Sequence, residues 1–159
     1  MDQPVFRLAV ADDLDAIVGL LADDAIGSQR ETINPKAKRS YETAFEAIQK
    51  DPRNSLHVVV IRGRVAGCLQ LTFMPCLSNR GGDRAILESV RIASELRGQG
   101  IGRRFVRYAV DLAREAGCVQ VQLTTDKRRV DAQRFYATLG FTRSHEGFKL
   151  MLGPDDRHT

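Results

Sequence analysis

The stretch SELRGQGIGRR, which spans Ser94–Arg104, joins a strand pattern to a helix pattern through three glycines. Before it, apolar and polar residues alternate over residues 86–92, with the period of two expected of a strand. After it, apolar residues recur every three or four positions over residues 101–116, and Gly117 ends the helix that this spacing predicts. The start of a helix carries unpaired N–H groups and the positive end of the helix dipole, and glycines let an anion approach them closely. The stretch therefore predicts a phosphate-binding turn.

The spacing of these glycines excludes two common phosphate-binding motifs. A P-loop needs G-x-x-x-x-G-K followed by Ser or Thr, and a dinucleotide fingerprint needs G-x-G-x-x-G. The glycines here stand at Gly98, Gly100 and Gly102, and no Lys-Ser or Lys-Thr pair follows them. An alternative interpretation is a glycine-rich turn that caps an ordinary amphipathic helix and binds no ligand.

The composition is that of one globular domain. With 159 residues, of which 43% are hydrophobic and 28% charged, the chain is long enough to bury a core. We expect a single domain over residues 1–153 and a flexible C-terminal tail over residues 154–159. The three cysteines form no C-x-x-C pair, which indicates a reducing compartment, with the cytoplasm as the default. No signal-peptide core and no run of about 18 apolar residues is present, so no membrane is expected as a partner.

Basic residues are concentrated around the central helix, although the net charge is only +4. They are Arg97, Arg103, Arg104, Arg107, Arg114, Lys127, Arg128, Arg129 and Arg134. Such a cluster can mark a nucleic-acid surface, but few aromatic residues lie between its members and it forms no known nucleic-acid motif. We therefore expect no nucleic-acid partner, since a multiply phosphorylated small ligand fits the same charges.

The other patterns predict an α+β fold. Strands are expected at 5–10, 56–61, 65–74, 85–92, 119–123, near 141 and at 148–152, and helices at 14–21, 41–48, 101–116 and 132–139. Asp12 is predicted to cap the first helix, with Asp15 completing a capping box. The pattern lapses over residues 23–39, which indicates either a functional lid or an inert surface loop. The strand, helix and strand over residues 85–123 predict a right-handed crossover, and ligands bind beyond the carboxyl ends of such parallel strands.

A family resemblance rests on two motifs. Arg97, Gly100 and Gly102 occupy the defining positions of R/Q-x-x-G-x-G/A, so the turn resembles the pyrophosphate loop of the GNAT superfamily of N-acetyltransferases. The segment Asp131–Phe141 is similar to the family signature N-x-x-A-x-x-x-Y-x-x-x-G-F, except that Asp131 falls near the position where many members carry Asn. Residues 124–149 look most like small bacterial members such as the aminoalkylphosphonate acetyltransferases. The element order also resembles the GNAT fold, which implies an α/β/α layered structure with a mixed, mostly antiparallel sheet and a central strand-loop-helix-strand crossover.

The resemblance implies acetyl-CoA as the acyl donor. The residues that it assigns to the coenzyme are Val90, Ile92, Arg97, Gly98, Gln99, Gly100, Ile101, Gly102, Arg103, Asp131 and Tyr136. In the family, main-chain N–H groups of the turn bind the pyrophosphate, and the preceding strand splays from its neighbour and holds the pantetheine arm like an added strand. One main-chain N–H of that strand also polarises the thioester carbonyl and stabilises the oxyanion.

The acceptor is expected to be a primary amine, which is protonated at neutral pH because amines of the lysine type have a pKa near ~10.4. A general base is therefore needed, and some family members carry a catalytic Glu at the strand position of Glu88. The alternation places Glu88 in phase with Ile86, Val90 and Ile92, so we expect its side chain to face an apolar layer. We expect Glu88 to accept the proton of the acceptor ammonium, either directly or through a water molecule. The alternative is a bulge that turns Glu88 to solvent or to Arg84.

Tyr136 matches the family tyrosine, which implies a general acid that protonates the departing CoA thiolate. Its alternative role is a core aromatic residue beside Phe135. Phe73, Glu88 and His145 are the candidate acceptor-binding residues, whereas His57 alternates with valines and is expected to be structural.

No His, Cys and carboxylate residues have the spacing of a metal site, and no serine lies in a nucleophile elbow, so direct transfer without metal or acyl-enzyme is expected. The sequence thus predicts an acetyl-CoA-dependent N-acetyltransferase acting on a small primary amine. The alternatives are an acetyl-CoA sensor without turnover, a protein-amine acetyltransferase, and a basic nucleic-acid-binding or partner-binding domain. Homodimers are common in the family, although the sequence itself does not show one.

Overall fold

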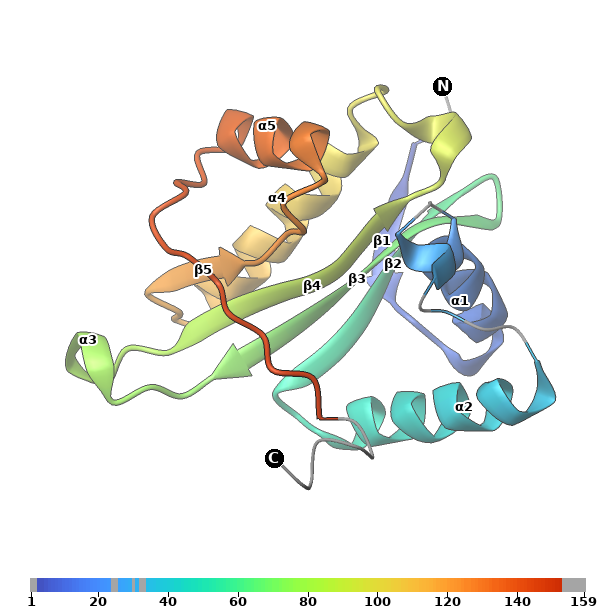
Figure 1. Ribbon diagram of the computed structural model, residues 1–159, viewed down its shortest axis with the longest axis horizontal. Coiled ribbons are helices and arrows are strands. Elements are labelled where there is room, and N and C mark those ends of the chain that lie inside the picture. Colours follow the sequence, from blue (N-terminus) through green and yellow to red (C-terminus); the bar gives the residue numbers. More distant parts are fainter. Residues whose placement is uncertain (1–2, 24–25, 30, 32–33, 153–159) are drawn as a thin grey trace. The chain divides into compact units, whose positions relative to one another are not determined.

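The computed structural model describes residues 3–23, 26–29, 31 and 34–152. It divides into two compact units, residues 1–123 and 124–159, which are considered separately. The first unit contains a five-stranded sheet in the order β1-β2-β3-β4-β5 (Figure 1). Its strands are β1 (Val5–Leu8), β2 (Asn54–Ile61), β3 (Arg64–Met74), β4 (Arg84–Ile92) and β5 (Gln120–Leu123). The first four strands pair antiparallel and β4 pairs parallel with β5, which confirms the predicted mixed α+β sheet.

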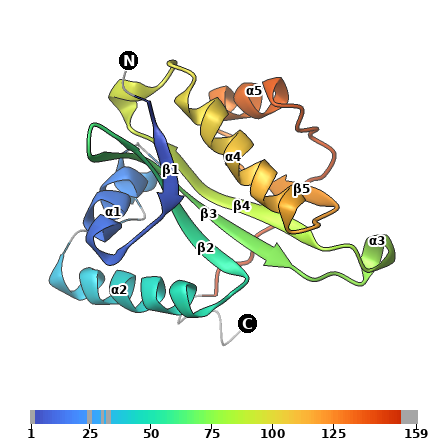
Figure 2. The ribbon, with the colours of Figure 1, turned by 180° about the vertical axis from the view of Figure 1, so that it is seen from behind.

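Helices cover both faces of this sheet (Figure 2). Helices α1 (Leu14–Ala22) and α2 (Pro35–Lys50) lie on one face, and α4 (Ile101–Glu115) lies on the other. Short helical segments are η1 (Ala11–Asp13), η2 (Gly27–Gln29), α3 (Ser78–Gly81) and η3 (Ser94–Leu96). Under α1 and α2 the core includes Ile17, Phe45 and Val58, while under α4 the ring of Phe105 stacks on that of Phe6 with 5.4 Å between centroids. In the described residues no helix is both long enough and apolar enough to span a bilayer.

The irregular segment predicted at residues 23–39 extends too far at its C-terminal end. Helix α2 begins at Pro35, because the Asn34 side chain accepts a 2.8 Å hydrogen bond from the Ala37 N–H and proline suits the first helical position. The Asn-Pro pair is therefore the start of a helix. Residues 24–25, 30 and 32–33 lie outside the described residues, and the lid interpretation stays a prediction.

Asp13 occupies the N-cap position of α1 and makes no side-chain capping hydrogen bond to that helix, so the prediction that Asp12 caps it was wrong. The Asp13 carboxylate accepts hydrogen bonds from the Val10 N–H at 2.8 Å and from both terminal nitrogens of Arg7 at 2.6 and 3.0 Å. Hydrogen bonding to Arg7 lowers the pKa of Asp13 and outweighs the opposing effect of its burial. This contact ties β1 to the start of α1.

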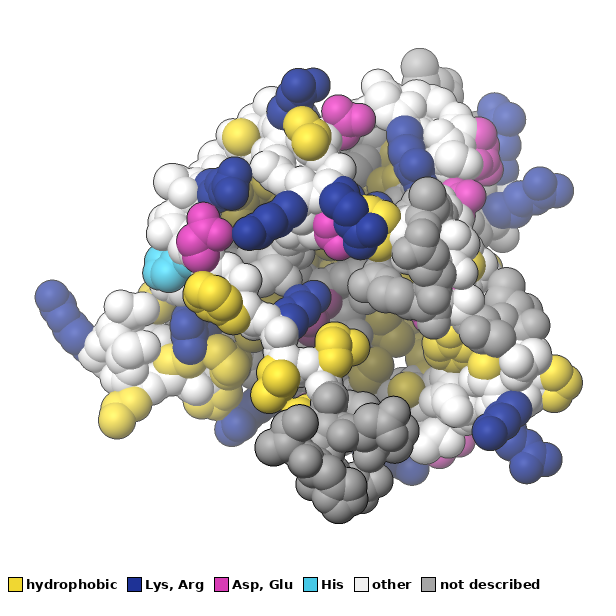
Figure 3. All heavy atoms as spheres, viewed as in Figure 1, with side chains coloured by type: hydrophobic (Ala, Val, Ile, Leu, Met, Phe, Trp, Pro, Cys, Tyr) yellow, Lys and Arg dark blue, Asp and Glu magenta, His cyan; other side chains and the backbone are white. Residues whose placement is uncertain are grey.

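The second unit contains helix α5 (Val130–Thr138), and its described residues beyond Thr138 form no strand. The strands predicted near 141 and at 148–152 are therefore wrong. Phe148 and Leu150 are 95% and 83% exposed, and Figure 3 shows yellow apolar side chains standing out along the course that this segment follows in Figure 1. Alternation alone suggested strands, but a strand also needs a hydrogen-bonded partner. The predicted single domain over 1–153 stays a prediction, and the tail 154–159 lies outside the described residues.

His57 is buried between β2 and α4, as expected for a structural residue. Its ring nitrogens lie 2.9 Å from Ser55 Oγ and 3.1 Å from the Tyr108 hydroxyl oxygen, and burial lowers its pKa to about 4. Between pH 6.5 and 4 the unfolded chain therefore binds a proton that the folded chain does not. We expect the free energy of unfolding to fall by about 3 kcal/mol as the pH is lowered through this window, measured by urea denaturation.

The variant His57→Gln should lose this pH dependence, because glutamine does not titrate. The matched control His145→Gln, at an exposed position, should keep it. A His57→Gln protein whose stability still falls as steeply as that of the wild type between pH 6.5 and 4 would contradict the assignment to His57.

Candidate active site

The glycine-rich turn has the geometry of an anion site. Gly98 and Gly100 have positive φ angles of 76° and 80°, and Gly100 is the N-cap of α4. The first hydrogen bond of the helix runs from the Arg104 N–H to the Gly100 carbonyl at 3.2 Å. The N–H groups of the first turn, including those of Ile101 and Gly102, therefore have no acceptor within the helix. Since the buried Ile101 side chain anchors the turn from below, these groups form a fixed cradle with the positive end of the helix dipole.

Substitution of Gly100 tests whether this geometry binds the coenzyme. A φ of 80° costs an L-residue roughly 1–2 kcal/mol, and no atom would obstruct an added Cβ, so Gly100→Ala should fold with a strained turn. We expect the Kd for acetyl-CoA to rise about tenfold, measured by calorimetry. The matched control is Gly117→Ala, which has a φ of 77° and equally open surroundings at the other end of α4. Equal loss of affinity in both variants would show a general effect on stability, not a role of the turn.

Strand β4 has an open main-chain edge beside this turn. Within the described residues its pairing with β5 covers Arg84–Leu87 and ends at the pair of Leu87 with Leu123. The Ala93 N–H donates to Ala66 O of β3 at 2.9 Å, so the preceding peptide groups of Ile92 face away from β3 by strand alternation. In the described residues this part of β4 thus has no strand partner on its outer side, although arginine side chains donate to Val90 O and Ile92 O. The coenzyme role that the resemblance implied for Val90 and Ile92 stays a prediction.

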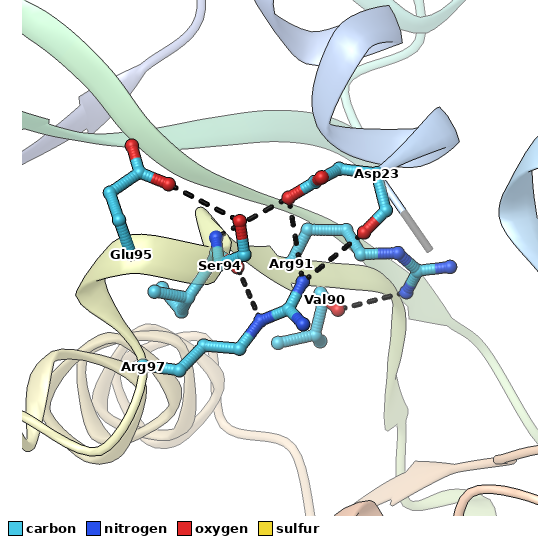
Figure 4. Close-up of polar contacts among 7 residues, drawn as sticks. Asp23, Val90, Arg91, Ser94, Glu95 and Arg97 are labelled. Carbon is cyan, nitrogen blue, oxygen red and sulfur yellow. Dashed lines mark hydrogen bonds and ion pairs between the residues drawn. The ribbon is translucent and has the colours of Figure 1, made fainter. Parts of the chain in front are cut away.

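Arg97 lies in a polar cluster that joins the turn to the end of α1 (Figure 4). Its Nε donates to Ile92 O at 3.0 Å, and its Nη2 lies 3.4 Å from Asp23 O and 3.6 Å from Asp23 Oδ2. The Ser94 N–H donates to the same carboxylate at 3.3 Å. Beside it, Nη1 of Arg91 donates to Val90 O at 2.9 Å. Sequence reasoning named Arg97 but missed its partner Asp23, because no local pattern signals a contact across 74 residues.

A β-bulge in β4 decides where Glu88 lies. Ser89 has a positive φ of 54°, and the pairing with β3 shifts register between Gln70–Glu88 and Cys68–Arg91. Ile86 and Glu88 therefore lie on the face of α1 and α2, whereas Ile92 pairs with Gly67 on the face of α4. The predicted single face for these residues was wrong. Glu88 is also exposed, so the expectation that it faces an apolar layer was wrong, and the alternative that its side chain faces solvent agrees with the structure.

Phe73 does not join Glu88. It pairs with the fully buried Ala85, two residues before Leu87 on the α4 face, so its side chain lies on the opposite side of the sheet from Glu88. The prediction that both line one acceptor site is wrong for Phe73, because the two positions differ by an odd number of residues along the paired strands.

The remaining candidates lie in the second unit. Tyr136 is half-buried in α5, and its ring centroid lies 5.1 Å from that of Phe135 and 5.7 Å from that of Phe141. Asp131 is fully exposed and its Oδ1 lies 3.7 Å from Nη1 of Arg134. His145 is exposed, with Nδ1 at 2.7 Å from Ser144 Oγ. Their roles at the active site stay predictions.

Much of the basic cluster is engaged within its own unit. Arg114 pairs with Asp111 at 2.7 Å, Arg128 with Asp126 at 2.8 Å, and the Arg104 guanidinium stands 5.9 Å above the Phe6 ring. These short-range pairs are typical of a solvated helix surface. They lower the positive electrostatic potential that would attract a polyanion such as a nucleic acid.

Comparisons with known proteins show the family and the fold of the chain. The family model for the acetyltransferase (GNAT) family matches residues 16–141. Aminoalkylphosphonate N-acetyltransferase of Salmonella typhimurium is 28% identical over 146 residues, which cover 92% of this chain and 90% of that protein. A crystal structure described as a transcriptional regulator from Bacillus halodurans C-125 has a TM-score of 0.91 at 45% identity, covering 94% of this chain and 100% of the other. A predicted acetyltransferase from Clostridium acetobutylicum, solved with acetyl-CoA, has a TM-score of 0.72 at 18% identity, covering 99% and 100%.

The chain therefore belongs to the acetyltransferase (GNAT) family, and it is an acyltransferase. The likeness to the Clostridium acetobutylicum structure, at 18% identity, shows the fold alone. The fold and the family predicted from the two motifs are both confirmed.

Proposed function

We propose that the protein transfers the acetyl group of acetyl-CoA directly to the primary amine of a small molecule. The observation that carries this proposal is the pairing of two features in one unit: the amide cradle at Gly98–Gly102 and the open main-chain edge of β4. Together they suit a ligand with a diphosphate at one end and an amide-containing arm at the other, which describes coenzyme A. The acetyl-CoA seen in a structural neighbour supports the same reading.

The proposed mechanism begins with the loss of a proton from the acceptor ammonium to Glu88, directly or through water. The amine nitrogen then attacks the thioester carbonyl carbon, and a main-chain N–H at Val90 or Ile92 donates to the oxyanion. When the C–S bond breaks, the CoA thiolate receives a proton from Tyr136, and the proton that the acetylated nitrogen then loses returns to the tyrosinate. The arm of the coenzyme also displaces Arg97 from Ile92 O, because both need the same acceptor.

The test has two stages. Calorimetry with acetyl-CoA should show binding, and an assay of free-thiol release over aminoalkylphosphonates, amino sugar phosphates, simple amines and a lysine peptide should then show transfer to a small amine. Absence of heat with acetyl-CoA overturns the proposal. Preference for the lysine peptide would assign the chain to the protein-amine acetyltransferases instead.

A second candidate is an acetyl-CoA sensor without turnover. One observation supports it: the structural neighbour at 45% identity is described as a transcriptional regulator. The two functions separate in the same assay, since a sensor binds acetyl-CoA and releases no thiol with any amine. We place the protein in the cytoplasm, in agreement with its three free cysteines, Cys68, Cys76 and Cys118. Homodimerisation stays a prediction drawn from the family.

A further inference from the structure

A row of polar side chains lies beside Glu88 on its face of the sheet. Asn54 of β2 pairs with Thr72 of β3, and Gln70 of β3 pairs with Glu88 of β4. Directly opposed residues share a face, so these four residues form one surface, which we call the polar shelf. Farther along the same face, Val58 and Cys68 belong to the core under α1 and α2. Asn54, Gln70 and Thr72 are only half-buried and Glu88 is exposed, so the shelf is open to a ligand.

One hydrogen bond sets the orientation of the Gln70 amide, and a second holds its acceptor, Asn54, in place. Asn54 Oδ1 accepts from Gln70 Nε2 at 2.9 Å and from Thr72 Oγ1 at 3.0 Å. Because the amide nitrogen of Gln70 is directed toward Asn54 on β2, its carbonyl oxygen Oε1 occupies the other branch of the amide, away from β2. Glu88 of β4 lies opposite Gln70 of β3. Opposed residues of antiparallel strands have Cβ atoms about 4.5–5.5 Å apart. Two side chains that can accept hydrogen bonds, a neutral amide and a carboxylate, therefore occupy opposed positions on one face of the sheet.

We propose that Gln70 binds the ammonium group of the acceptor together with Glu88 and thereby selects acceptors whose nitrogen carries at least two N–H donors, as a primary ammonium does. This inference rests on the proposed function and names a residue of the same site. A primary ammonium has three N–H donors and a positive charge, so it can donate to Gln70 Oε1 and Glu88 at once. An alcohol or a fully alkylated ammonium cannot do so. Asn54 acts as the positioning residue, since it keeps the Gln70 carbonyl turned toward the ligand.

The variant Gln70→Met tests this role, because methionine has nearly the same length and carries no carbonyl acceptor. With 2-aminoethylphosphonate as the acceptor, we expect its KM to rise about tenfold, with the KM for acetyl-CoA unchanged and kcat reduced less than the KM rises. The matched control is Gln120→Met on β5, an exposed glutamine that pairs with Arg84 at the far end of the β4–β5 ladder. An unchanged KM for the amine in Gln70→Met overturns the inference.

A second measurement keeps the test independent of how the variant folds. In the wild-type protein, 2-aminoethylphosphonate and its N,N,N-trimethyl derivative are compared as ligands by calorimetry in the presence of CoA. We expect the Kd of the trimethyl derivative, which has no N–H donor, to be at least tenfold higher than that of the primary amine. In Gln70→Met we expect the ratio of these two Kd values to be smaller. Equal binding of the two ligands overturns the inference. Loss of the proposed function has a different signature, because the wild-type protein then releases no thiol with any amine of the panel.

Discussion

Glu88→Gln lowers kcat for acetyl transfer by about 100-fold or more and leaves the Kd for acetyl-CoA within about twofold. Glutamine keeps the size and the hydrogen-bonding reach of the side chain but cannot accept a proton from the acceptor. The ammonium then remains protonated and its nitrogen has no lone pair to attack the thioester. Since Glu88 stands before the bulge and is exposed on the α1 and α2 face, the substitution disturbs no buried contact.

Steady-state kinetics over a range of pH provide the measurement. The reduction of kcat in Glu88→Gln should become smaller at high pH. More of the acceptor amine is then already neutral, so no base is needed to deprotonate it. Glu46→Gln, on the exposed surface of α2, is the matched control and should behave as the wild type. An unaltered kcat and pH profile in Glu88→Gln would move the role of base to another group or to solvent.

The coenzyme turn could be predicted from the sequence because all its determinants are local. Gly98 and Gly100 permit positive φ angles, Ile101 begins the apolar stripe of α4, and Gly117 ends the helix within one contiguous segment. The hairpin of β2 and β3 was predictable for the same reason, since Arg62 and Gly63 both adopt the positive φ angles of its two-residue turn.

The sequence offered a bulge near Glu88 only as an alternative and could not locate it, because a bulge depends on the partner strand. In the sequence, Ile86, Glu88, Val90 and Ile92 alternate without interruption, and nothing marks Ser89 as the residue that shifts the register. The bulge is visible only in the pairing with β3, where the single residue Leu69 lies opposite two residues of β4, Ser89 and Val90. Contacts such as Asp23 with Arg97 escape prediction likewise, since their partners are brought together by the fold and not by any spacing in the chain.

Tyr136→Phe lowers kcat by about 100-fold, with little change in the KM for acetyl-CoA, if its hydroxyl protonates the departing thiolate. Phenylalanine preserves the ring contacts with Phe135 and Phe141 and removes the hydroxyl that the proposed mechanism needs as a proton donor. Tyr108→Phe is the matched control, because it removes a hydroxyl that contacts His57 in the core and should affect stability but not kcat. A donor role further requires that acyl donors with more acidic leaving thiols, which depart without a proton, recover most of the lost rate in Tyr136→Phe. If kcat is unchanged with acetyl-CoA, or if such donors recover nothing, Tyr136 serves as a packing residue and the thiolate departs unaided.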